Sequence, residues 1–199
     1  MANFARSFQG KSLLLLLCIG VLSLSRLTLA QDPSRREKAS SATSDAQVSF
    51  ASLKSLAGTW SGQVTTDPHN PDIEGPIQVT MRVASNGNVL MHEIAPGGVP
   101  EPTMIYLADD RLTLVHYCEA GNRPRMVARK SPDQKTVDFE FVDISGSETP
   151  AYLHDFVFNL IDADHHTEDW TFVVPGGPML HAHFDLKRAK ESVQPLPGK

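Results

Sequence analysis

Gly58-Thr59-Trp60 is the stretch at which the pattern of this sequence changes. Before it, Phe50, Leu53 and Leu56 recur at three-residue spacing, which predicts a short helix with one apolar face. After it, apolar and polar residues alternate, most clearly over residues 77–83, as they do in a half-buried strand. The tripeptide therefore separates one short helix from a long series of strands.

Turn signals divide the rest of the chain into ten candidate strands. Residues 85–88 contain Asn-Gly, the strongest short hairpin signal, and comparable breaks recur further along the chain. No connection is long enough to hold a crossover helix, so neighbouring strands are predicted to be antiparallel. The strands are predicted over residues 60–66, 76–84, 89–95, 102–108, 111–118, 124–130, 135–144, 151–161, 165–174 and 179–188.

This pattern predicts an all-β fold in which the strands form either a closed up-and-down barrel or a sandwich. A single meander favours the barrel, because closure leaves no strand with an unpaired edge. We therefore expect a roughly ten-stranded antiparallel β-barrel with the short N-terminal helix capping one end.

The helix that runs into Gly-x-Trp, followed by a meander ending at Leu186-Lys187-Arg188, resembles the calycin superfamily of lipocalins and fatty-acid-binding proteins. Ten strands and Gly-x-Trp-x-Gly, completed by Gly62, are most similar to the nitrobindin branch and to uncharacterised exported bacterial proteins of that type. The resemblance implies a barrel that binds a ligand in its lumen. Because nitrobindins hold haem through a His on the last strand, it also implies haem, with His181 or His183 as the axial ligand.

Residues 1–30 have the pattern of a secretory signal peptide. Arg6 and Lys11 precede a ten-residue apolar stretch at 13–22, and Thr28-Leu29-Ala30 offers small residues at a cleavage site. Ten apolar residues are too few to cross a bilayer, which needs about 20. We therefore expect an exported protein, periplasmic or secreted, with no integral membrane span once the signal is cleaved.

The remaining chain is predicted to hold one domain. Residues 31–47 have no aromatic and almost no aliphatic side chain, which predicts a disordered linker, and residues 189–199 predict a flexible tail. The calycin-like barrel domain is expected over residues 48–188. Cys118 is the one cysteine left after cleavage, so the apolar core must stabilise the fold without an internal disulfide.

The charge of the mature chain excludes some partners. Without residues 1–30 the chain has 15 Lys and Arg against 23 Asp and Glu, a net charge of −8. The sequence contains no run or stripe of Lys and Arg, which argues against nucleic acid and anionic membranes as partners. It also lacks Gly-x-Ser-x-Gly, a phosphate loop and a dinucleotide fingerprint.

One end of the barrel is predicted to be a structural plug. Trp60 begins the first strand and Arg188 ends the last, so the two meet if the barrel closes. A guanidinium over an indole is a cation–π contact worth about 0.5–2 kcal/mol. His166 and Glu168 fall toward this end, where Glu168 is predicted to pair with Arg188.

The opposite end gathers polar side chains over an apolar interior. Strand directions place His116, Cys118 and His154 there, together with His181 and His183. The bulkier alternating set predicts the inward faces, which comprise Leu112, Leu114, His116, Cys118, Val137, Phe139, Phe141, His154, Phe156, Phe158, Leu160, His166, Glu168, Trp170, Phe172, Leu180, Ala182, Phe184 and Leu186.

A concave apolar interior with a few polar groups is the usual site for a small ligand. We expect a small apolar or amphipathic molecule to enter at this end, oriented by His116, His154 and Tyr106, with Trp170 in the wall. Arg125 lies in a polar hairpin that could bind a ligand carboxylate in a bidentate manner or could be an ordinary solvated turn. The alternative is a barrel filled by its own side chains, among them nine Phe and two Trp.

Cys118 beside His116 or His154 is the one candidate nucleophile with a base near it, which leaves a Cys/His-dependent enzyme as a further alternative. A buried, inert thiol is the commoner fate of a single cysteine. The same three residues have the chemistry of zinc ligands, but their spacing matches no recognised zinc pattern. The sequence therefore assigns no catalytic residue and no metal ligand, and it favours binding over catalysis.

Overall fold

The computed structural model describes residues 43–130, 133 and 135–190. The predicted signal peptide, most of the predicted linker and most of the predicted tail lie outside these residues. The described part of the chain holds two short 3-10 turns, η1 (Ser85–Gly87) and η2 (Pro96–Gly98), one α-helix and ten strands. The helix is α2 (Asp45–Lys54), and the strands are β1 (Gly58–Asp67), β2 (Gly75–Ala84), β3 (Val89–Ile94), β4 (Glu101–Ala108), β5 (Arg111–His116), β6 (Arg123–Ala128), β7 (Thr136–Ser145), β8 (Tyr152–Asp162), β9 (His165–Val173) and β10 (Leu180–Arg188).

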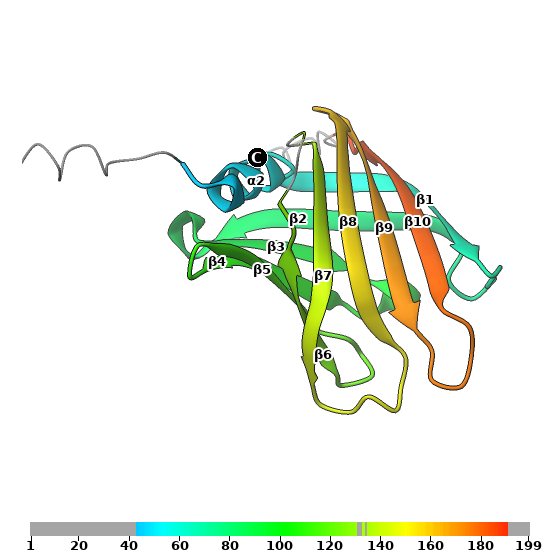
Figure 1. Ribbon diagram of the computed structural model, residues 1–199. Coiled ribbons are helices and arrows are strands. Elements are labelled where there is room, and N and C mark those ends of the chain that lie inside the picture. The colour runs from blue at the N-terminus through cyan, green and yellow to red at the C-terminus, as the bar shows by residue number, and fades with distance from the viewer. Residues whose placement is uncertain (1–42, 131–132, 134, 191–199) are drawn as a thin grey trace, which may run out of the picture. The chain divides into compact units, whose positions relative to one another are not determined.

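The strands form a closed antiparallel barrel in which each strand pairs with its neighbours in the sequence (Figure 1). Closure is made by β1 and β10, with Trp60 opposite Arg188 and Val64 opposite Phe184. The red strand β10 accordingly lies beside the cyan strand β1 in Figure 1. Closure pairs every strand on both sides, so the predicted ten-stranded up-and-down barrel is confirmed.

The helix α2 caps one end of this barrel, as predicted. It begins with a capping box in which the Ser44 hydroxyl accepts the N–H of Gln47 at 3.2 Å and the Gln47 side chain accepts the N–H of Ser44 at 2.9 Å. Phe50 and Leu53 are buried and belong to the same apolar core as Trp60. We call the opposite end of the barrel the distal end.

Trp60 and Arg188 meet beneath α2. The Trp60 indole donates to the carbonyl of Leu56 at 2.8 Å, and the Arg188 guanidinium lies 4.3 Å from the indole centroid, which confirms the predicted cation–π contact. Arg188 also donates to the carbonyl of Ala57 at 3.0 Å. Gly58 has a φ of +143°, and a Cβ there would lie 2.6 Å from the Arg188 guanidinium, so this close approach requires glycine.

Large side chains fill the interior. Those of Trp60, Trp170, Phe139, Phe156 and Phe158 are the largest that are fully buried. The alternation predicted for β5, β7, β9 and β10 is confirmed at the buried residues Leu112, Leu114, Val137, Phe139, His166, Glu168, Trp170, Ala182, Phe184 and Leu186. A barrel of this kind is compatible with a ligand in its lumen, but much of this interior is occupied by the protein's own side chains.

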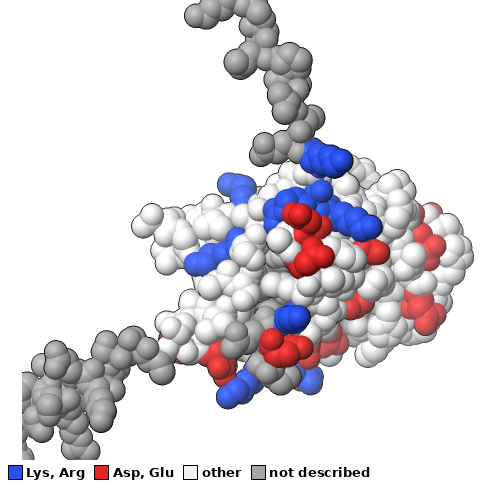
Figure 2. Space-filling model, turned by 90° about the horizontal axis from the view of Figure 1, so that it is seen from above, with Lys and Arg blue, Asp and Glu red and all other residues white. Residues whose placement is uncertain are grey.

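The outer surface carries charges of both signs. Figure 2 shows Lys and Arg side chains lying among Asp and Glu on the face that it presents. Several charges are paired, including Lys130 with Asp45 at 2.9 Å and Arg188 with Asp164 at 3.2 Å. In the part of the chain that is described, every helix is too short or too polar to cross a lipid bilayer.

Candidate functional site

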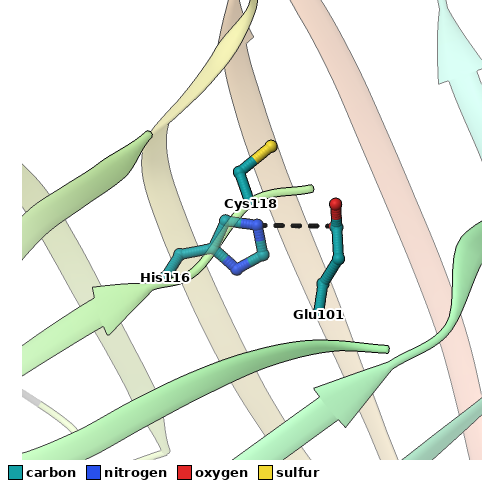
Figure 3. A group of neighbouring side chains, drawn as sticks. All are labelled: Glu101, His116 and Cys118. Atoms are coloured by element: carbon teal, nitrogen blue, oxygen red, sulfur yellow. Dashed lines mark ion pairs between the residues drawn. The ribbon is translucent and has the colours of Figure 1, made fainter. Parts of the chain in front are cut away.

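Glu101, His116 and Cys118 meet at the distal end of the barrel. Glu101 is the first residue of β4, His116 is the last residue of β5, and Cys118 follows in the turn beyond. A carboxylate oxygen, a ring nitrogen and the Sγ atom of these residues all lie within 4.8 Å of one another. Figure 3 shows the carboxylate facing the imidazole, with the thiol beside them. We call this group the distal cluster.

His116 is held in one orientation from the barrel side. Its Nδ1 lies 2.9 Å from the hydroxyl of Thr103, the residue opposite it on β4. Its buried Nε2 lies 3.6 Å from Glu101 Oε2, longer than a hydrogen bond, and has no hydrogen-bond partner among the described residues. A buried polar atom without a hydrogen bond costs about 1–3 kcal/mol, so this nitrogen, whose one polar contact is the long one with Glu101, can bind a ligand.

Glu101 presents one carboxylate oxygen to the cluster. Its Oε1 accepts the N–H of Glu119 at 2.8 Å, which leaves Oε2 facing His116. Burial by itself would raise the pKa of the Glu101 carboxyl, but His116 and the Glu119 N–H outweigh burial and the pKa lies below its ordinary value. Glu101 is therefore a carboxylate at neutral pH.

Cys118 is a free, partly buried thiol. Its position is fixed by a tight turn in which its carbonyl accepts the N–H of Gly121 at 2.9 Å. Burial raises the pKa of the Cys118 thiol, and the negative charge of Glu101 raises it further. A thiol with a raised pKa is protonated at neutral pH and is a weak nucleophile. This environment makes Cys118 a poor nucleophile. It is compatible with a role as a metal ligand, because a bound cation would displace the thiol proton.

Trp170 forms the wall on the inner side of the distal cluster. Its ring lies 5.6 Å from the His116 ring in an edge-on arrangement. Its Nε1 donates to Glu168 Oε2 at 3.0 Å, so the indole connects the cluster to a carboxylate deeper in the barrel. Trp170 is thus in the interior, as predicted, and contacts the predicted residue His116.

Glu168 does not pair with Arg188, so that prediction is wrong. His92 Nε2 lies 3.1 Å from both Glu168 oxygens, and His166 Nε2 lies 3.1 Å from Oε1. Arg188 pairs with Asp164 outside the interior. Burial would raise the pKa of the Glu168 carboxyl, but the two histidines outweigh it and lower the pKa to about 2.

The Glu168 carboxylate has little capacity left for a ligand, because it already accepts from two imidazoles and an indole, whereas the Nδ1 atoms of His92 and His166 have no hydrogen-bond partner among the described residues. His92, one of the three side chains that hydrogen-bond to Glu168, was not predicted from the sequence as an interior residue. The alternation of Leu90, His92 and Ile94 was the available signal, since all three are buried and the pleat places them on one face. We interpret this network as structural.

Tyr106 and Arg125 lie on the outer face of the barrel, so the predicted role of Tyr106 in orienting a ligand in the lumen is wrong, and Arg125 of the polar hairpin does not point toward the lumen. Tyr106 follows the buried Ile105, and successive side chains of a strand point to opposite faces. Arg125 lies between two buried residues of β6 and forms a bidentate pair with Asp143, with Nε 2.9 Å from Oδ1. Its guanidinium is already occupied.

His154 does not join the distal cluster, because a β-bulge interrupts the alternation of β8. The register shifts between Leu153 and Asp155, and Leu153 takes the buried position. His154 stacks on Phe141 with centroids 4.9 Å apart and lies 2.9 Å from Asp155 Oδ2. Its predicted partnership with His116 and Cys118 is therefore wrong, and Glu101 takes the third place.

His181 and His183 lie on the outer face of β10, where both are exposed. Ala182 and Phe184 take the buried positions of this strand. His183 Nδ1 lies 2.6 Å from Asp169, and His181 Nδ1 lies 3.1 Å from the Thr171 hydroxyl. Neither histidine faces the interior, so their predicted role as axial ligands of a haem in the lumen is wrong.

Comparisons with known proteins support the fold and leave the family open. No family model and no curated protein matches the sequence. The crystal structure of Rv2717c from M. tuberculosis is similar over 71% of this chain and 98% of its own, with a TM-score of 0.54 and 17% identity. A protein of unknown function from the DUF3598 family of Nostoc punctiforme is similar over 69% of this chain and 48% of its own, with a TM-score of 0.48 and 11% identity. At such identities the likeness concerns the fold alone.

Proposed function

We propose that the protein binds a divalent transition-metal ion at the distal cluster, with zinc as the best match. The observation that carries this proposal is the buried Nε2 of His116, which has no hydrogen-bond partner among the described residues and lies in one group with a carboxylate oxygen and a sulfur. Imidazole, thiolate and carboxylate are the three donor types that proteins use for zinc.

The spacing of the donor atoms supports this proposal. With Zn–N and Zn–O distances of about 2.0 Å, two donors of a tetrahedral ion lie about 3.3 Å apart, and a sulfur donor lies about 3.6 Å from either. The His116 Nε2 to Glu101 Oε2 distance is 3.6 Å, and the whole set lies within 4.8 Å.

The surroundings of His116 support the same function. Metal-binding histidines usually have their second nitrogen hydrogen-bonded, and Thr103 supplies this contact at 2.9 Å. A cation would also balance the charge of Glu101 and of a deprotonated Cys118, which are costly to keep together in a partly buried site.

Zinc affinity measured by competition with a chromophoric chelator tests the proposal. His116→Ala and Cys118→Ser should each weaken binding by more than about 100-fold, because each removes a ligand. His183→Ala is the matched control, because it removes an exposed histidine from the outer face. No saturable binding by the unmodified protein, or equal losses in His183→Ala, would refute the proposal.

Binding of a small apolar or amphipathic molecule is a second candidate function. The supporting observation is a pair of half-buried aromatic side chains at the distal end, Phe141 and Tyr152, whose ring centroids are 5.7 Å apart. Titration with a fluorescent fatty acid tests it, and Phe141→Ala should weaken any such binding. A probe that shows no saturable binding rules out this candidate.

Export, calycin membership and haem binding belong with these proposals, because they rest on the sequence pattern. N-terminal sequencing of protein purified from its source would find Gln31 first if residues 1–30 are a cleaved signal. Haem would need a ligand other than His181 and His183. A Soret band that persists in the His181→Ala and His183→Ala proteins would support such a site. No Soret band in the unmodified protein after reconstitution with haem would refute haem binding.

A further inference from the structure

We infer that the metal centre of the distal cluster keeps one coordination position open to solvent, and that a small neutral nitrogen donor, such as an imidazole or an amine, binds there. This inference rests on the proposed function, since it needs an ion bound by Glu101, His116 and Cys118. It deepens that function by naming the class of ligand that the bound ion takes.

The number of protein donors carries the first step. The described residues bring three donors together at the distal end: Glu101, His116 and Cys118. Zinc sites closed for structural purposes have four protein ligands, whereas sites with three keep water or an external ligand in the fourth position. The distal cluster therefore has the ligand count of an open site.

The direction of the open position follows from what surrounds the cluster. On the barrel side the Trp170 ring lies 5.6 Å from His116 and its single polar atom donates to Glu168, while the Thr103 hydroxyl is already hydrogen-bonded to His116 Nδ1 at 2.9 Å, so both polar groups on this side are occupied. On the other side Cys118 is partly exposed and the Glu101 side chain keeps 12% of its surface accessible. The accessible side is therefore the route by which a fourth ligand arrives from solvent.

The charge of the site selects the class of ligand. A carboxylate and a thiolate together neutralise a divalent ion, so the centre has no net charge to attract an anion. Three neutral histidines, by contrast, leave the full charge on zinc and lower the pKa of bound water to about 7. A neutral nitrogen donor replaces the water of the distal centre without adding charge beside Trp170, whereas an anion would leave a net negative charge in this partly buried place.

Cobalt substitution tests the inference on the whole protein. The visible bands of a Co²⁺-loaded centre depend on its ligands, so imidazole and azide can each be titrated against them. We expect saturable spectral changes with imidazole at concentrations at least about tenfold lower than with azide. A tetrahedral cobalt spectrum that imidazole leaves unchanged, or that azide changes more readily, would overturn the inference while leaving metal binding intact.

A charge variant sharpens this test. Glu101→Gln removes one negative charge from the centre and should raise azide affinity relative to imidazole by about tenfold. Glu93→Gln on the outer face of β3 is the matched control and should leave the preference unchanged. If Glu101→Gln abolishes cobalt binding, the comparison of imidazole with azide in the unmodified protein still decides whether the centre prefers a neutral donor to an anion. Failure of the unmodified protein to bind cobalt or zinc would refute the proposed function itself.

Discussion

His116 uses its two ring nitrogens differently. Nδ1 lies 2.9 Å from the Thr103 hydroxyl, and Nε2 faces Glu101 at 3.6 Å. A neutral imidazole that donates from Nδ1 keeps its lone pair on Nε2, the form in which histidine binds a metal. The residue type was visible in the sequence, but the choice of nitrogen was not, because it depends on Thr103 lying opposite His116 in the sheet.

Thr103→Val tests this positioning role. Valine keeps the shape of the side chain but cannot hydrogen-bond to Nδ1, so the ring loses its fixed orientation. We expect zinc affinity to fall by about 10–100-fold while the barrel stays folded. Thr113→Val is the control, since this buried hydroxyl bonds only the carbonyl of Arg111 among its described contacts. Unchanged affinity in Thr103→Val would contradict the assigned role.

Metal affinity should rise with pH because of Cys118. Burial raises the pKa of this thiol, so at neutral pH the thiol must lose a proton when an ion binds. Glu101 has a pKa below its ordinary value and is already ionised, so it releases none. We expect the affinity to increase about tenfold for each pH unit below the thiol pKa, measured by chelator competition over a pH series. Cys118→Ser should have a flatter pH dependence, and an equal slope in both proteins would contradict this account.

The β4–β5 hairpin brings the distal cluster together, and its register was within reach of the sequence. Ala108 pairs with Arg111 across the turn, and Thr103 pairs with His116. Extending this register by two residues brings Glu101 opposite Cys118, on the inward face of both strands. The turn at residues 108–110 was recognised, but the register that it sets was not followed back to Glu101.

The bulge in β8 shows the limit of this kind of prediction. Strict alternation from Phe156 places His154 inside, and the shift between Leu153 and Asp155 puts Leu153 there instead. A bulge adds one residue to one strand, and its position depends on the partner strands. The bounds of β8 were predicted nearly in full, but the sequence did not show which of its first residues point into the barrel.

The pairing of β1 with β10 closes the barrel, and Gly62 is the close contact in that pair. A Cβ at this position would lie 1.8 Å from the carbonyl oxygen of Asp185. We expect Gly62→Ala to force the strands apart and to lower the free energy of unfolding by about 2–4 kcal/mol, measured by urea denaturation. Ser61→Ala, an exposed change on the same strand, should cost less than about 1 kcal/mol. Equal stability of the two variants would show that β10 accommodates the methyl group.

At the scale of the whole molecule, buried polar side chains lie at several heights along the barrel, within an interior that is otherwise apolar. The distal cluster, Trp170 and the Glu168 network follow one another from the distal end toward Trp60, whose ring lies 4.2 Å from that of His166. The strand count and the closed topology could be predicted because alternation and turns are local signals. The contact of Glu168 with His92 could not, because His92 is 76 positions away and meets it only across the closed barrel, whereas His166 and Trp170 lie two residues from Glu168 on the face predicted for β9.

Glu168 should make the stability of the whole barrel dependent on acid. Its pKa in the folded protein is about 2 against an ordinary value of 4.5, so its contribution is fully present above about pH 4.5 and is lost as the pH falls toward 2. We expect Glu168→Gln to lower the free energy of unfolding by about 2–4 kcal/mol near neutral pH and to flatten its decline in acid. Urea denaturation over a pH series measures both effects.

Glu74→Gln is the matched control for this acid dependence. The pKa of Glu74 is also lowered to about 2, chiefly by the Thr66 hydroxyl and by His69, but this carboxyl lies near the surface, where solvent screens its interactions. Its replacement should therefore change the acid profile far less than that of Glu168. If the two variants have the same profile, the acid dependence comes from hydrogen bonding at the surface, and the buried carboxylate between His92 and His166 does not control the stability of the barrel.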